Sequence, residues 1–182
     1  MKLFIASDIH GDLEAAELIA KRYAESGADR LVLLGDLLYH GPRNDLPERY
    51  APKKVIEVLN GLGNEVLCVR GNCEAEVDQM VLKFPVLADY ALIDAGDVRI
   101  FATHGHKYNM QALPPLRAGE VLLHGHTHVT AFETFGDGNV YVNPGSAALP
   151  KENTLKGYII YQDRTFSFRR LDNGEEYMSE RI

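Results

Sequence analysis

The sequence predicts an α/β fold in which two sheets pack against each other and helices lie outside them. In the first half, three buried strands alternate with helices, and each strand ends in a polar turn that contains glycine, a pattern typical of β-α-β crossovers and a parallel sheet. From Pro85 onward, short strand candidates follow one another with turns between them, which predicts a second sheet. The length of 182 residues favours a single domain that covers residues 1–182.

The elements of the first half follow from apolar runs and from start and stop residues. Asp12 is a typical N-cap and Gly27 a typical C-terminal stop for the first helix, and Pro52 suits the first turn of a second helix that Gly61 ends. We expect strands at 3–6, 31–34 and 65–69, helices at 13–26, 52–60 and 74–82, and a loop at 39–51. That loop is long enough to suggest a functional role.

The sequence pattern of the second half is typical of short strands separated by turns. The segment Gly136-Asp137-Gly138-Asn139 predicts a hairpin turn. We expect strands at 86–93, 98–103, 120–124, 129–135, 140–142, 157–161 and 166–171. The tail at 172–182 is polar and predicts no element.

Composition excludes several classes of protein. Acidic residues outnumber basic ones 26 to 19, and the net charge of −7 argues against a general nucleic-acid binder or a protein that binds anionic membranes through a basic face. The sequence has no apolar run of about 18 residues, and Asp8 interrupts the N-terminal one, so we expect a cytoplasmic protein without membrane contact. Cys68 and Cys73 are too close in sequence for a predicted disulfide, which indicates free thiols.

Polar residues follow each of the first three predicted strands. Asp8 and His10 lie two residues apart after the first strand, Asp36 follows the second, and Asn72 follows the third. Each residue alone is compatible with an ordinary cap or turn. In an open α/β sheet, however, these positions meet at the carboxyl edge, where ligands bind.

Histidines are concentrated in one part of the second half. Five of the seven lie between residues 104 and 128, and His104, His126 and His128 each fall near a predicted strand end. Together with the aspartates and the asparagine they form a set of nitrogen and oxygen donors that needs no thiolate, which favours Mn, Fe, Zn, Ni or Co over a structural cysteine–zinc site. The sequence alone does not choose among these metals.

The order of these motifs resembles that of the calcineurin-like metallophosphoesterases, and in particular of their small bacterial phosphodiesterases. The matching motifs are Asp8-x-His10, Gly35-Asp36, Gly71-Asn72, His104 and Gly125-His126-Thr127-His128, and they extend over residues 1–150. The resemblance implies an αββα sandwich of two mixed sheets with helices on the outer faces. It also implies a binuclear metal centre, most often with manganese, and a small-molecule phosphodiester as substrate, with a homodimer or higher homo-oligomer as a possible assembly.

The resemblance also assigns roles to individual residues. It implies that one metal is bound by Asp8, His10, Asp36 and His128, and the other by Asp36, Asn72, His104 and His126. Asp36 would then bridge the ions, and a bridging hydroxide would attack phosphorus in line with the leaving oxygen. The catalytic residues implied are Asp36, Asn72, Cys73 and His104.

The motif Gly71-Asn72-Cys73-Glu74 departs from the wider superfamily, which often has histidine where this chain has Cys73. A thiol with a reference pKa of about 8.5 is a poorer acid than imidazolium at neutral pH, so activated or nucleotide-like diesters are favoured over substrates with alkoxide leaving groups. Cys73 either contacts the substrate chemically or only fills space beside the metals. In the small bacterial phosphodiesterases that this chain resembles, cysteine also occurs at this position. The residue after it is aspartate there, where this chain has Glu74.

Further histidines and one arginine are candidates for substrate binding. His40 and Arg43 lie in the long loop after Asp36, and Arg43 suits contact with a phosphate. His106 either orients a metal ligand or reaches the substrate. His124 is expected to be a strand residue without a direct role.

Three functions therefore remain open. A metal-dependent phosphodiesterase is favoured, a phosphomonoesterase of the same fold is the alternative within enzymes, and a non-catalytic interaction scaffold is the alternative outside them. The scaffold is disfavoured because every ligand position of the family pattern is filled in this sequence.

Overall fold

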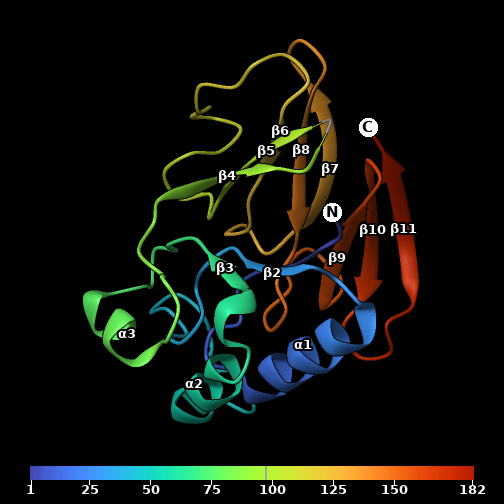
Figure 1. Cartoon of the computed structure of the whole chain (residues 1–182). Helices are drawn as coiled ribbons and strands as arrows, with labels where there is room; N and C mark the ends of the chain where they lie inside the picture. Colours follow the sequence, from blue (N-terminus) through green and yellow to red (C-terminus); the bar gives the residue numbers. More distant parts are fainter. Residues whose placement is uncertain (97) are drawn as a thin grey trace.

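The computed structural model describes residues 1–96 and 98–182, in which two mixed sheets face each other (Figure 1). The first sheet has the order β11-β10-β9-β1-β2-β3, and the second has the order β4-β5-β6-β8-β7. Strands of the first are β1 Leu3–Ala6, β2 Arg30–Leu33, β3 Val66–Cys68, β9 Gly157–Gln162, β10 Thr165–Arg170 and β11 Glu176–Arg181. Strands of the second are β4 Tyr90–Asp94, β5 Arg99–Thr103, β6 Val121–Leu123, β7 Thr130–Phe135 and β8 Asn139–Pro144.

Parallel pairing is confined to the middle of each sheet and to one edge of the first. In the first sheet β1, β2 and β3 are parallel, whereas β9, β10 and β11 pair antiparallel. In the second sheet β5, β6 and β8 are parallel, and the edge strands β4 and β7 are antiparallel. The carboxyl ends of the parallel strands carry the loops that form the candidate metal centre.

Strand β1 separates two layers of core because its side chains alternate between the two faces of the sheet. Leu3 and Ile5 point into the layer between the sheets, where they join Ile100, Val121 and other apolar residues of the second sheet. Phe4 and Ala6 belong to the layer under the helices. All four β1 side chains are buried, which explains why this strand is a continuous apolar run.

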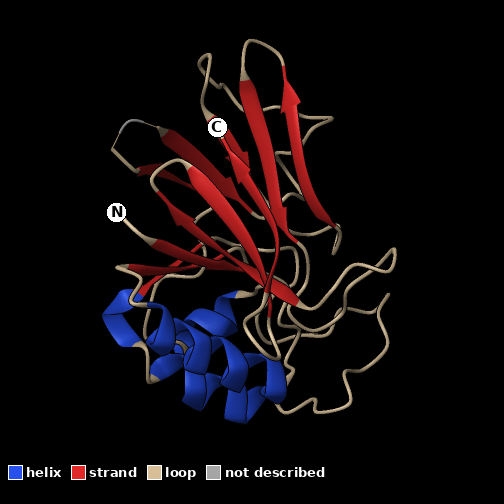
Figure 2. Ribbon diagram, turned by 90° about the vertical axis from the view of Figure 1, so that its right-hand side faces the viewer, coloured by secondary structure: helices blue, strands red, loops and turns tan. Residues whose placement is uncertain are grey.

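The helices gather on the outer face of the first sheet (Figure 2). They are α1 Leu13–Ser26, α2 Pro52–Asn60 and α3 Glu76–Val81, with a short 3₁₀ turn at Gly63–Glu65. Asp12 caps α1 by accepting from the backbone N–H groups of Glu14 and Ala15, and Gly27 ends it with a φ of 64°. Helix α2 has Pro52 in its first turn. These starts and stops agree with the sequence predictions.

The outer face of the second sheet is covered differently. Phe101, Leu122 and Tyr141 form a small apolar cluster there, and Tyr108 and Met110 from the segment after β5 pack on it. In the described part of the chain no helix lies over this face. The two-sheet sandwich is therefore confirmed, with its helices on the outer face of the first sheet alone.

Two further details differ from the sequence predictions. Strand β4 begins at Tyr90 rather than at residue 86, because Val86 is buried under the helices and its N–H donates to the Gln79 side chain instead of to a strand. Strand β11 lies in the polar tail where none was expected. It is an edge strand whose residues are mostly exposed, so it lacks the alternation that marks a half-buried strand.

Cys68 and Cys73 are both free thiols, as predicted. None of the helices in the described residues has the length and apolar character that crossing a bilayer requires.

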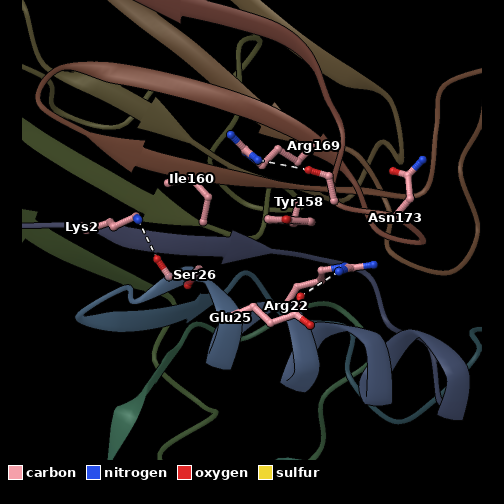
Figure 3. A pocket seen from close by; sticks show the side chains of 9 residues that line it. Lys2, Arg22, Glu25, Ser26, Tyr158, Ile160, Arg169 and Asn173 are labelled. Atoms are coloured by element: carbon pink, nitrogen blue, oxygen red, sulfur yellow. Dashed lines mark hydrogen bonds and ion pairs between the residues drawn. The ribbon is translucent and has the colours of Figure 1, made fainter.

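A polar hollow of about 340 Å³ lies between α1 and strands β9 and β10 (Figure 3). Two of its three basic side chains have these partners: Lys2 Nζ donates to the Ser26 carbonyl at 2.6 Å, and Arg22 Nη1 pairs with Glu25 at 2.7 Å. Arg22 Nε also donates to the Leu171 carbonyl, which ties α1 to the chain after β10. These contacts anchor the helix to the sheet.

We expect Ile5→Ala to lower the free energy of unfolding by about 2–5 kcal/mol, because it opens a cavity between the sheets. Ile5 is fully buried, whereas Leu92 is 57% exposed, so Leu92→Ala is the matched control and should change stability by less than about 0.5 kcal/mol. Urea unfolding followed by circular dichroism measures both. Equal effects of the two substitutions would contradict the assignment of the inter-sheet core.

Candidate metal centre

The loops after the parallel strands of both sheets bring the predicted ligands together. Asp8 and His10 follow β1, Asp36 follows β2, and Asn72 follows β3. From the second sheet, His104 follows β5 directly, and His126 and His128 follow β6. Residues up to 120 positions apart in sequence therefore share one end of the sandwich, the edge at which α/β sheets bind ligands.

One group of donors consists of Asp8, His10 and His128, all of which are buried. Asp8 Oδ1 lies 3.5 Å from His10 Nε2 and 3.3 Å from His128 Nε2, and the two Nε2 atoms are 3.1 Å apart. Asp8 Oδ1 itself has no hydrogen-bond partner. A buried carboxylate oxygen without a partner is costly, and a cation among these three atoms would remove the cost.

A second group of donors lies beside the first. His104 Nε2 is 3.1 Å from Asn72 Oδ1 and 3.0 Å from His126 Nδ1. Asp36 Oδ2 connects the two groups, because it is 3.7 Å from His10 Nε2 and 3.5 Å from His104 Nε2. The geometry therefore places one carboxylate oxygen between two sets of donors.

Backbone carbonyls fix which ring nitrogens face the centre. His10, His104 and His128 each have Nδ1 within hydrogen-bond distance of a carbonyl oxygen, of Tyr39 at 2.9 Å, Leu34 at 2.7 Å and Leu149 at 2.7 Å. A carbonyl only accepts, so the proton sits on Nδ1 and the Nε2 lone pair points inward. This arrangement is typical of metal-ligating histidines.

The spacing of the donors suits a metal ion. Two nitrogens that each lie about 2.0–2.1 Å from one ion are about 2.9–3.4 Å apart for octahedral to tetrahedral angles. The 3.1 Å between the Nε2 atoms of His10 and His128 falls in that range. Two facing lone pairs at this distance repel each other unless a cation or a proton lies between them. The residues thus fit divalent metal ions.

Electrostatics in the centre favour the ligand form of Asp8 and of His126. Burial raises the pKa of Asp8, but the neighbouring imidazoles of His10 and His128 outweigh it and hold the pKa well below its usual range. Burial and the neighbouring His104 lower the pKa of His126 to about 4, so this imidazole is neutral at physiological pH. Metal binding requires an ionised carboxylate and neutral imidazoles.

The backbone at the proposed ligands is strained. Asp8, His10, Asp36, His126 and His128 all have left-handed φ values, between 49° and 67°. Such conformations cost about 1–3 kcal/mol each and persist where surrounding contacts enforce them. Here the His10 N–H donates to the Asp36 carbonyl at 2.8 Å, and the His126 N–H donates to Asp8 Oδ2 at 3.0 Å. The loops of the two sheets therefore hold each other in place.

Glycines in the motifs allow the loops to approach closely. A Cβ added at Gly71 would collide with the Asp36 carboxylate, and one added at Gly125 would collide with the side chain of Ser7. The end of β8 and the turn after it support the same loops: Asn143 Nδ2 donates to the Gly125 carbonyl at 3.0 Å, and Ser146 Oγ donates to the Asp8 carbonyl at 2.7 Å.

Glu74 is a residue whose role the sequence did not reveal. It is buried, and its carboxylate accepts from the backbone N–H groups of Asp36 at 2.9 Å, Leu37 at 2.7 Å and Gly71 at 2.5 Å. Burial, and next the charge of Asp36, raise its pKa to about 7. Glu74 thus fastens the loop after β2 to the loop after β3. Its place in the Asn-Cys-Glu motif was the only signal for it.

Cys73 is half-buried beside the centre. Its N–H donates to Asp36 Oδ1 at 2.9 Å, and its sulfur lies 3.3 Å from Asn72 Nδ2. Burial and the Asp36 charge raise the pKa of the thiol well above its usual value. The side chain is therefore a neutral thiol across the physiological pH range.

A hollow of about 380 Å³ opens over the proposed ligands and is here called the front hollow. It is lined by Asp36, Asn72, His126 and His128, by Cys73 and Thr127, by the loop segment 41–44, and by Lys151. Arg43 therefore lies at the hollow, and sequence reasoning missed Lys151, which carries no motif. His40 is not among the lining residues, because its ring packs against Tyr39 and Tyr50 instead.

A second hollow of about 420 Å³, here called the side hollow, adjoins the front hollow at His126 and Thr127. His106 and His124 line this second space rather than the first. The His124 ring is buried and stacks on Tyr141 with centroids 4.4 Å apart.

Comparison with known proteins identifies the class to which this fold and centre belong. The family model described as the calcineurin-like phosphoesterase superfamily domain matches residues 1–165. The chain belongs to this superfamily.

Individual relatives extend this result. The chain is 49% identical over 158 residues to phosphodiesterase YfcE of Escherichia coli K12, covering 87% of this chain and 85% of that protein. The solved structure of E. coli YfcE, described as a phosphoesterase, matches with a TM-score of 0.96 and 44% identity over 100% of both chains. Vps29 of Chaetomium thermophilum matches with a TM-score of 0.61 at 17% identity, over 100% of this chain and 97% of that one, which is a likeness of fold alone.

We expect Glu74→Gln to lower the free energy of unfolding by about 1–3 kcal/mol, because an amide offers one acceptor oxygen where three buried N–H groups now share a carboxylate. Glu76→Gln is the matched control, since the Glu76 side chain is 81% exposed. Denaturant unfolding of the metal-free proteins measures the difference. A wild-type stability in Glu74→Gln would show that the loops do not depend on this carboxylate.

Proposed function

We propose that the protein is a metal-dependent phosphodiesterase that hydrolyses a small-molecule phosphodiester at a binuclear centre. The observation that carries this proposal is the position of Asp36 Oδ2 between two sets of donors, beneath a hollow with basic side chains at its rim. Membership of the phosphoesterase superfamily and the 49% identity to a protein named phosphodiesterase support it.

Each half of the centre would hold one ion. Asp8, His10, Asp36 and His128 would bind the first, and Asp36, Asn72, His104 and His126 the second. When bound there, two divalent ions would lower the pKa of water to supply the nucleophile and would neutralise the phosphoryl oxygens as charge develops on them. Imidazole nitrogens mixed with carboxylate and amide oxygens suit manganese, iron, zinc, nickel or cobalt, and we propose manganese as the native metal.

Residues around the ligands would prepare the substrate. The guanidinium of Arg43 and the ammonium of Lys151 attract the phosphate to an otherwise acidic protein, and Arg43 can bind two phosphoryl oxygens at once. Cys73 contacts the same space as an uncharged thiol, which does not repel the anionic substrate. Because a thiol with a raised pKa is a poor proton donor, the site favours esters whose leaving group departs without protonation.

Other properties stay predictions. We propose that residues 1–182 form a single domain, because both sheets contribute to one inter-sheet core. We also propose a cytoplasmic location and a homo-oligomeric assembly.

The alternatives make different demands on the site. A phosphomonoesterase would bind a dianion with one substituent, whereas here two adjoining hollows meet at the proposed ligands, which favours a diester. A scaffold of the same fold needs no complete donor set. The complete set in this chain therefore favours catalysis.

We expect chelation to abolish hydrolysis of bis(p-nitrophenyl) phosphate and Mn²⁺ to restore it. Asp36→Asn, which keeps the shape but removes the shared charge, should reduce kcat by at least about a hundredfold in the presence of Mn²⁺. Release of p-nitrophenol measures both effects. Asp137→Asn, in the exposed hairpin turn, is the control and should match the wild type.

Two outcomes would refute this function. Activity that survives both chelation and Asp36→Asn would remove the metal mechanism. A higher kcat/KM on p-nitrophenyl phosphate than on a p-nitrophenyl diester would instead identify a monoesterase.

We expect Cys73→His to reduce the dependence of kcat on the pKa of the leaving group, because imidazolium can protonate a poor leaving group that the thiol cannot. The measurement is the Brønsted slope over a series of phenyl diesters with different ring substituents. For the least activated ester, kcat should rise by about tenfold or more. Cys73→Ser is the control, since a hydroxyl is no better an acid. An unchanged slope in Cys73→His would show that residue 73 does not face the leaving group.

A further inference from the structure

The side hollow contains chemistry that the proposed metal ligands do not use. It is formed by the segment after β5, by β7 and by the start of the loop after β6, and it shares His126 and Thr127 with the front hollow. A molecule bound to the metals can therefore extend into either space. Both hollows are within the range of ligand pockets, about 300–1,000 Å³.

The two hollows differ in charge. The front hollow has the cations of Arg43 and Lys151 on its wall. The side hollow has the carboxylate of Glu133, and none of the described residues that line it is a lysine or an arginine. An anionic group would be repelled from the side hollow, whereas an uncharged one would not.

Two histidines that line the side hollow have ring nitrogens without hydrogen-bond partners. His124 is buried, and its Nδ1 lies 3.0 Å from the Gly125 carbonyl, so Nδ1 carries the proton and Nε2 is an acceptor. Neither His124 Nε2 nor His106 Nδ1 has a hydrogen-bond partner. Buried polar atoms without partners destabilise a protein unless something satisfies them, and the polar groups of a ligand would do so once these rings turn toward the hollow.

We propose that the side hollow binds one substituent of the phosphodiester, and that this substituent is an uncharged alcohol with several hydrogen-bonding groups, of about the size of a nucleoside. This inference rests on the proposed function and defines its substrate class. His106 and His124 then contact the substituent, Glu133 excludes acidic ones, and Met110 forms an apolar part of the wall.

The test compares two esters with the same leaving group: the p-nitrophenyl ester of thymidine 5′-phosphate and methyl p-nitrophenyl phosphate. We expect the wild type to prefer the nucleoside ester in kcat/KM by about tenfold, the effect of one or two hydrogen bonds. Met110→Trp fills the side hollow and should abolish this preference. Leu113→Trp, on the same segment but 52% exposed and outside the hollow, should keep it.

A second comparison tests the charge. Glu133→Gln should increase, by several-fold, the ratio of kcat/KM for a p-nitrophenyl diester with a carboxylate on its other substituent to kcat/KM for the nucleoside ester. No change in Glu133→Gln would show that this residue does not select against acidic substituents, and would overturn that part of the proposal.

The outcomes distinguish a failure of this inference from a failure of the proposed phosphodiesterase activity on which it rests. Absence of Mn²⁺-dependent hydrolysis of either ester by the wild type would refute the phosphodiesterase itself. Hydrolysis without a preference, or a preference that survives Met110→Trp, would refute the side hollow as the binding place. Equal losses on both esters in Met110→Trp would also refute it, because the hollow would then hold the leaving group that both esters share.

Discussion

The arrangement of this protein depends on placing the Asp36 carboxylate between histidines from both sheets. Asp36 Oδ2 lies within 3.7 Å of His10 from the first sheet and 3.5 Å of His104 from the second. Buried carboxylates close to one another repel, and that repulsion contributes, after burial itself, to the raised pKa of Glu74 beside Asp36. Divalent cations would relieve it, so metal binding and the stability of the loops should be coupled.

The sandwich explains how so polar a centre can be held in a buried position. Parallel strands in each sheet end at the same edge, so short loops suffice to bring the donors together. Left-handed backbone at five proposed ligands costs free energy, and the contacts between the two sheets sustain it. The buried apolar strands are thus the support on which the strained loops depend.

Sequence reasoning predicted the elements that local pattern determines and the ligands that motifs mark. The run at 3–6, the cap at Asp12 and the stop at Gly27 gave the first strand and helix correctly, and the family motifs contained all seven proposed ligands. The edge strand β11 was not predicted, because a mostly exposed strand carries no hydrophobic period. The hydrogen bonds of Glu74 with the N–H groups of Asp36 and Leu37 depend on the tertiary fold, because those residues are distant in sequence. The position of Lys151 at the front hollow depends on the tertiary fold for the same reason.

Charge shows how the bulk composition and the site can point in opposite directions. The net charge of −7 argues against polyanionic partners, yet a phosphodiester is itself an anion. Four positive charges from two divalent ions would leave −3 overall, but they would act beside the ligands, where burial strengthens electrostatic interactions. Arg43 and Lys151 add to that local field at the front hollow, while Glu133 places a negative charge at the side hollow. A substrate with one phosphodiester charge and an uncharged substituent matches both surfaces.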